Sequence, residues 1–259
     1  MRLLATLAAL LFPAAAMACG PDTDCVVGDR IYRIAVPEGV ETPGALVFAH
    51  GYQGTANGAM RGENLRNLAF ENDMALIAVQ GVNGNWQLPG TPREPDHTGE
   101  AEYAYFDAVM ADAVDRFNID MGRTVMTGFS AGGMMVWNLI CHRSQLFTGF
   151  VPMSGTFWTP EPATCDTPPT DVVHIHGTAD RTVPLEGRPI DAQHQGDVLK
   201  TLGMYAGFGG YAGAMPSSVQ DMACDTRTNP DGRILAFCTF DGGHGFGINR
   251  LRAAMAMVE

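Results

Sequence analysis

The sequence predicts a single α/β domain, in which a mostly parallel sheet is covered by helices on both faces. Short apolar runs alternate along the chain with longer helical patterns, as expected for repeated strand–helix units. The length of 259 residues fits one domain, and a hydrophobic content of 46% is enough to fill one sizeable core. Residues 123–137 add a third observation, because a short apolar strand there turns through Gly-Phe-Ser-Ala-Gly at 128–132 directly into an apolar helix.

The individual elements follow from hydrophobic patterning and from the Gly and Pro residues that interrupt it. Strands are expected at residues 30–36, 44–50, 74–79, 124–126, 149–154, 171–176 and 233–240. Helices are expected at residues 56–70, 100–117, 195–205 and 249–258 and along the apolar run after residue 132. The alternating residues 30–36 predict an edge strand, and the glycine-rich residues 207–213 predict a mobile cap or loop.

The first 18 residues predict a secretory signal peptide. They combine one positive charge at Arg2, an apolar run and small residues directly before Cys19. No later stretch approaches the roughly 18 to 20 apolar residues that are needed to cross a membrane. We therefore expect residues 19–259 to form an exported domain, periplasmic or extracellular, without an integral membrane segment.

Cysteine usage agrees with export. The chain has six cysteines, all after the signal peptide: Cys19, Cys25, Cys141, Cys165, Cys224 and Cys238. An even number in an oxidising compartment favours disulfides over free thiols or a metal site. Proximity in the sequence favours pairing each cysteine with its nearest neighbour along the chain. The alternative is that Cys19 is a lipidated N-terminus, which would leave Cys25 unpaired.

The charge balance limits the classes of partner. The formal net charge is −12, which disfavours binding to nucleic acid, to anionic lipid or to a polyanionic substrate. The oligomeric state is left open by the sequence.

Ser130 is the expected nucleophile. A G-x-S-x-G pattern placed between a strand and a helix forces a sharp turn that lifts the serine above the sheet edge. The first free N–H groups of the following helix can then receive a developing oxyanion, with Ala131 as the expected donor.

Asp180 and His244 are expected to complete a catalytic triad. Asp180 follows the strand 171–176, and His244 lies in a Gly-flanked loop after the last strand, which gives the chain order Ser, acid, His. Among the seven histidines, only His244 both follows Ser130 and Asp180 and lies in a loop at the end of a predicted strand. His174 and His176 share a strand face without a third ligand of suitable spacing, so we expect buried histidines there and no metal site.

Two further segments are expected to build the site. The turn His50-Gly51-Tyr52 follows a buried strand and predicts a second oxyanion donor, the backbone N–H of Tyr52. Trp86 lies in a loop rich in Gly, Asn and Pro, where it is equally well interpreted as a wall of the substrate pocket or as a cap on the core.

Taken together, these motifs resemble the secreted polyhydroxybutyrate depolymerase and feruloyl esterase group of α/β-hydrolases. The resemblance covers residues 28–250 and is most specific in the segment His-Gly-Thr-Ala-Asp-x-x-Val-Pro at 176–184. It implies the α/β-hydrolase fold, with Ser130 as nucleophile, Asp180 as acid and His244 as base. Two departures are Gly-Phe-Gly at 245–247, where many members have Trp-Pro, and the missing linker and granule-binding domain.

We therefore expect residues 19–259 to be the catalytic domain of a secreted serine esterase that needs no cofactor. The first expectation is a polyhydroxybutyrate depolymerase type acting on hydroxyalkanoate oligomers or polyester, with soluble oligomers or small esters favoured. The alternative is a feruloyl or acetyl-xylan type carbohydrate esterase. Peptidase or acyltransferase activity, and a catalytically silent binding domain, are the remaining alternatives.

Overall fold

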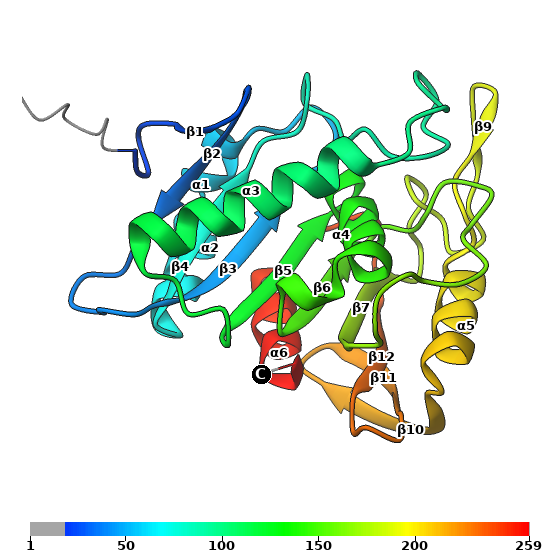
Figure 1. Cartoon of the computed structure of the whole chain (residues 1–259). Helices are drawn as coiled ribbons and strands as arrows, with labels where there is room; N and C mark the ends of the chain where they lie inside the picture. The colour runs from blue at the N-terminus through cyan, green and yellow to red at the C-terminus, as the bar shows by residue number, and fades with distance from the viewer. Residues whose placement is uncertain (1–18, 259) are drawn as a thin grey trace, which may run out of the picture.

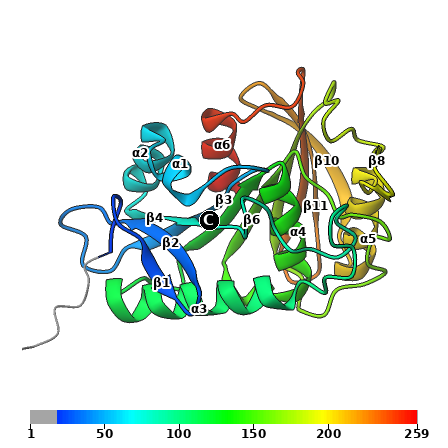
Figure 2. The same cartoon turned by 90° about the horizontal axis from the view of Figure 1, so that it is seen from above.

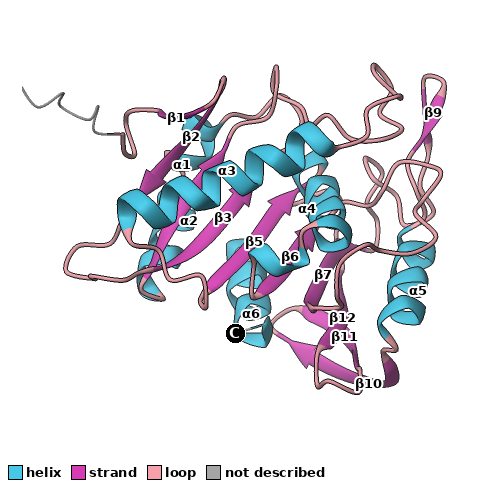
Figure 3. Ribbon diagram, in the orientation of Figure 1, coloured by secondary structure: helices cyan, strands magenta, loops and turns pink. Residues whose placement is uncertain are grey.

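The structure is a computed structural model that describes residues 19–258, so the predicted signal peptide at 1–18 lies outside the described residues (Figure 1). The strands are β1 (Cys25–Val27), β2 (Arg30–Ala35), β3 (Gly44–Ala49), β4 (Met74–Val79), β5 (Thr124–Phe129), β6 (Gly149–Met153), β7 (Asp171–Gly177), β8 (Pro189–Ile190), β9 (Gln193–His194), β10 (Ala212–Val219), β11 (Met222–Thr228) and β12 (Ile234–Phe240). The helices are α1 (Ala56–Met60), α2 (Glu63–Glu71), α3 (Glu100–Phe117), α4 (Ala131–His142), α5 (Val198–Gly209) and α6 (Ile248–Val258), with a short 3-10 turn at Ser144–Leu146 (Figure 3).

One 10-stranded sheet organises the chain, in the order β1-β2-β4-β3-β5-β6-β7-β12-β11-β10. The strands from β4 to β12 in this order pair in parallel, whereas pairing is antiparallel at both ends of the sheet. The mostly parallel sheet predicted from the sequence is confirmed. Parallel strands end at the same edge of a sheet, so the loops after β3, β5, β7 and β12 meet there.

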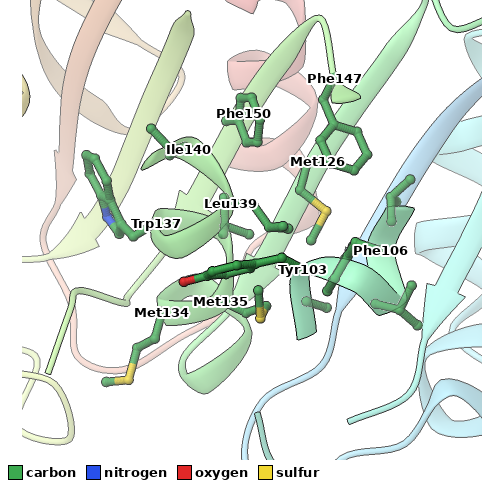
Figure 4. Close-up of a cluster of buried hydrophobic side chains, with 14 of the residues drawn as sticks. Tyr103, Phe106, Met126, Met134, Met135, Trp137, Leu139, Ile140, Phe147 and Phe150 are labelled. Carbon is green, nitrogen blue, oxygen red and sulfur yellow. The ribbon is translucent and has the colours of Figure 1, made fainter. Parts of the chain in front are cut away.

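Helices cover both faces of this sheet, as predicted. In the view from above, α3, α4 and α5 lie on one side of the sheet and α1, α2 and α6 on the other (Figure 2). Each side has its own cluster of buried side chains. On the first side, Tyr103 and Phe106 of α3 belong to the same buried cluster as Met134, Met135 and Trp137 of α4 and as Met126 of β5 and Phe150 of β6 (Figure 4). This packing fixes α4, and with it the turn that carries Ser130.

Three predicted elements were wrong in detail. The predicted edge strand at 30–36 is second in the sheet, because β1 pairs outside it, next to the disulfide of Cys25. The single helix predicted at 56–70 is divided into α1 and α2, since Gly62 between them has an extended conformation (φ −69°, ψ 91°). The residues expected to form a mobile cap instead end α5 at Gly210 (φ 69°) and enter β10, which pairs with β11.

The disulfide pairing predicted from proximity is confirmed, with bonds Cys19–Cys25, Cys141–Cys165 and Cys224–Cys238. The bond to Cys25 engages the Cys19 thiol that a lipid anchor would require. Disulfides persist in oxidising compartments, which supports the expected export. Within residues 19–258, no helix combines the length and the apolar character needed to cross a membrane.

Candidate active site

Ser130 lies at a strained turn between β5 and α4. Its backbone has φ 59° and ψ −121°, a conformation that residues other than glycine rarely adopt. Two hydrogen bonds hold this conformation. The Ser130 N–H donates to the Met153 carbonyl at 3.0 Å, and the Ser130 carbonyl accepts from the Met134 N–H at 3.0 Å. The turn therefore presents Ser130 above the sheet edge, as the motif predicts.

Glycines on both sides of Ser130 let backbone segments meet without side chains between them. A Cβ atom built on Gly132 would lie only 2.0 Å from the carbonyl oxygen of Ala49 in β3. A Cβ built on Gly128 would lie 2.5 Å from the carbonyl oxygen of Gly132. The G-x-S-x-G pattern is thus required by close packing of α4 against β5 and β3.

Asp180 and His244 form a hydrogen-bonded pair. The Asp180 Oδ2 atom lies 2.7 Å from His244 Nδ1, while Oδ1 accepts from the backbone N–H groups of Thr182 at 2.8 Å and Val183 at 2.9 Å. The loops that carry the pair are joined where β7 and β12 end, because the Ala179 N–H donates to the Gly242 carbonyl at 2.8 Å. Asp180 therefore holds the proton of His244 on Nδ1 and leaves Nε2 free to accept a proton.

The Asp180 carboxyl is charged in this environment. Burial raises its pKa, but the hydrogen bonds from His244, Val183 and Thr182 outweigh burial, and the pKa is lowered overall. A charged carboxylate here stabilises a positive charge on His244.

The histidine lies beside the serine turn. The His244 ring is 4.6 Å, centroid to centroid, from the ring of Phe129, the residue before Ser130. Phe246 packs edge-on against Phe129 and Phe48 and so holds the histidine loop over β3 and β5. The structure thus places Asp180 in contact with His244 and His244 beside the turn of Ser130, at the ends of β5, β7 and β12.

The turn after β3 approaches Ser130 closely. A Cβ built on Gly51 would lie 3.5 Å from the Ser130 Cβ. Tyr52 and Ala131, the two predicted oxyanion donors, line the same cavity as Ser130. Ala131 is the first residue of α4, so its N–H has no acceptor within the helix. Their role as donors stays a prediction.

His50 has a structural role that the sequence analysis missed. Its Nε2 accepts the Gly81 N–H at 3.0 Å, so Nδ1 carries the proton and donates to the Gly51 carbonyl at 2.8 Å. Burial lowers the pKa of His50, which keeps the ring neutral and these roles fixed. His50 thereby ties the turn before Tyr52 to the loop that carries Trp86. The feature of the sequence that could have indicated this role is the position of His50 directly before the turn at Gly51 and Tyr52.

A cavity of about 300 Å³ opens next to Ser130. Its lining is mainly apolar and includes Trp86, Trp158 and Met134. Trp86 is only 1% exposed, and its Nε1 donates to the His50 carbonyl at 2.9 Å. Trp86 therefore has both of the roles that the sequence left open: it caps the core, and it forms a wall of this cavity.

His174 and His176 are buried, as predicted. Trp137 Nε1 donates to His174 Nδ1 at 3.1 Å, His174 Nε2 lies 2.9 Å from His176 Nδ1, and His176 Nε2 lies 2.8 Å from the Val183 carbonyl. Burial lowers the pKa of both rings. The chain of hydrogen bonds ends on the loop of Asp180 and supports its conformation.

Esterases are found among the known proteins that this chain resembles. Residues 100–228 match the phospholipase/carboxylesterase family. The putative esterase NocK of Nocardia uniformis subsp. tsuyamanensis is 30% identical over 165 residues, which is 61% of this chain and about half (47%) of NocK. The probable feruloyl esterase C of Aspergillus flavus is 27% identical over 226 residues, covering 84% of this chain and 77% of that protein.

Solved structures match over nearly the whole chain. Acetyl xylan esterase from Aspergillus awamori aligns with a TM-score of 0.62 at 16% identity, covering 88% of this chain and 94% of that one. The chain has the α/β-hydrolase fold. The named relatives favour the carbohydrate-esterase alternative over the depolymerase type, which stays a prediction.

Proposed function

We propose that the protein is an exported serine esterase that hydrolyses carboxylic esters through Ser130, His244 and Asp180. The observation that carries this proposal is the Asp180–His244 hydrogen bond beside a strained serine, at the wall of an apolar cavity. The family match and the esterases among the relatives support the same reaction class.

The reaction is acyl transfer in two steps. His244 Nε2 takes the Ser130 hydroxyl proton while the serine oxygen attacks the ester carbonyl carbon, and Asp180 stabilises the imidazolium that forms. The N–H groups of Ala131 and Tyr52 stabilise the oxyanion, and His244 returns the proton to the leaving alcohol. Water then attacks the acyl-enzyme with His244 again as base, which releases the acid and regenerates the serine.

We propose esters of hydroxycinnamic acids, such as feruloyl esters, as the first substrate class. The indoles of Trp86 and Trp158 line the cavity beside Ser130 and suit a flat aromatic acyl group. Relatives named feruloyl esterase C align over 84% of this chain, which supports the same class.

Hydroxyalkanoate oligomers are the second candidate, because cations lie at the same cavity. Arg93 and Arg188 line it together with one acidic residue, Asp191. Within residues 19–258 neither arginine forms an ion pair. A soluble hydroxyalkanoate oligomer ends in a free carboxylate, which a guanidinium without an acidic partner binds well.

Side-by-side hydrolysis of methyl ferulate and a soluble 3-hydroxybutyrate oligomer tests the proposal, with purified wild type and Ser130→Ala. Release of ferulate that is lost in S130A supports the first class, and release of 3-hydroxybutyrate supports the second. If wild type cleaves neither ester faster than S130A, the acyltransferase or silent-domain alternative takes precedence.

A further inference from the structure

Gln195 carries a buried polar group whose role the reaction does not explain. The residue is 3% exposed, and its Oε1 atom has no hydrogen-bond partner among the described residues. Buried polar atoms are nearly always hydrogen-bonded, because leaving one unsatisfied is costly. Ser154 Oγ is in the same situation, but of the two residues only Gln195 lines the cavity next to Ser130.

The backbone holds Gln195 at this position. Its N–H donates to the Arg188 carbonyl at 2.9 Å, and the residue forms an antiparallel bridge with Trp158. The next N–H, of Gly196, donates to the Phe157 carbonyl at 2.8 Å. Because both neighbouring segments pair with it, the backbone of Gln195 is fixed at the wall of the cavity.

The surroundings define which group could satisfy the amide. The cavity is lined mainly by apolar side chains, among them Trp86, Trp158 and Met134, and it also contains the proposed nucleophile. A carboxamide in such a lining recognises a neutral group that donates and accepts hydrogen bonds, which a hydroxyl does. Discrimination is strong in this arrangement, since a substrate without the hydroxyl leaves the amide unpaired.

We propose that the Gln195 carboxamide forms a subsite for a hydroxyl on the acyl part of the ester. The inference rests on the proposed esterase function and deepens it by naming the chemistry that selects the substrate. The hydroxyl has two possible sources, the phenol of a hydroxycinnamoyl group and the aliphatic alcohol of a 3-hydroxyalkanoyl group.

Paired esters that differ by one hydroxyl test the subsite. kcat/KM is measured for methyl p-coumarate against methyl cinnamate, and for methyl 3-hydroxybutyrate against methyl butyrate. In the wild type, we expect one pair to show a preference of about 10-fold or more for the hydroxylated ester. In Gln195→Leu this ratio should fall to about 1. The pair that responds identifies the source of the hydroxyl.

Gln193→Leu is the matched control. Gln193 is a glutamine of the same β8–β9 hairpin that does not line the cavity, so its variant should keep the wild-type ratio. Unchanged ratios in Q195L for both pairs, or no preference in the wild type for either pair, would overturn the subsite. A ratio that falls equally in Gln193→Leu and Gln195→Leu would overturn it too.

A second measurement does not depend on the substrate. Replacing an unsatisfied amide by the apolar Gln195→Met should raise the Tm of the free enzyme, by roughly 2–4 °C. A lower Tm would mean that Gln195 has a structural partner, and this too would overturn the subsite. Failure of the esterase proposal is recognised separately, because the wild type would then not cleave p-nitrophenyl acetate faster than S130A.

Discussion

Replacing Gly132 by alanine tests whether the serine turn depends on direct backbone contact between α4 and β3. An ideal Cβ at Gly132 lies 2.0 Å from the Ala49 carbonyl oxygen and 2.8 Å from that of His50. Real Cβ contacts essentially never fall below 3.0 Å, so α4 and β3 must separate by about 1 Å. Both obstacles are backbone atoms of a central strand and the residue after it, which cannot rotate aside.

The expected cost follows from this separation. Overpacking in a well-packed region costs about 1–3 kcal/mol, and we expect about 3 kcal/mol because backbone must move. In a domain of this size, that lowers the Tm by roughly 6–12 °C. A shift of about 1 Å of Ser130 against His244 should also lower kcat/KM about 100-fold.

Thermal unfolding and hydrolysis of p-nitrophenyl acetate measure the two effects. Gly203→Ala is the matched control, since a Cβ at this helical glycine of α5 meets nothing within 4 Å. Alanine favours the helix, so G203A should gain about 1 kcal/mol. A G132A enzyme with wild-type Tm and rate would refute the reasoning, and so would a G203A enzyme as destabilised as G132A.

Three further predictions concern pH, the disulfides and substrate charge. Burial lowers the pKa of His174 and His176 in the folded state, so the unfolded chain binds more protons below about pH 6.5. Stability to urea should therefore fall from about pH 6.5 downward, and less steeply in His174→Gln. The Cys141–Cys165 bond closes a loop with a sequence separation of 24, so replacing both cysteines by serine should cost about 3–4 kcal/mol of unfolding free energy. Arg188→Gln should lower the kcat/KM ratio of a 3-hydroxybutyrate dimer to its methyl ester about 10-fold, since the methyl ester lacks the carboxylate.

Each of these three predictions has its own contradicting result. Stability that stays flat between pH 7 and pH 5 would contradict neutral buried histidines. Serine variants with an unchanged urea midpoint would show that the disulfide contributes nothing to stability. An unchanged dimer-to-methyl-ester ratio in R188Q would remove the specific support for the second substrate class.

Much of the sheet could be predicted because its central strands are continuous apolar runs. Strands β3, β4 and β7 are buried on both faces, so their sequence pattern is plain. The hairpin of β10 and β11 was missed, because β10 is almost fully exposed and has Gly, Ser and Pro among its residues. Its pairing with the neighbouring strand is a tertiary contact that local propensity does not encode.

The residues of the site likewise include some that the sequence predicts and some that it does not. Ser130, Asp180 and His244 could be predicted as a triad because each follows a strand and the chain order is restricted by the fold. The position of Gln195 at the cavity could not be predicted, because it depends on pairing with Trp158, which lies in a distant part of the sequence. His50 was treated only as the residue before the oxyanion turn, whereas its two ring nitrogens contact that turn at Gly51 and the following loop at Gly81.

Covalent labelling of Ser130 tests the central claim most directly. Purified protein is treated with an alkyl fluorophosphonate, digested and mapped by mass spectrometry, alongside Ser130→Ala and His244→Ala. We predict one adduct, on Ser130. It should be lost in S130A and form at least about 1,000-fold more slowly in H244A, since the serine needs a base. An adduct on another residue, or ester hydrolysis that persists at the wild-type rate in S130A, would contradict the account.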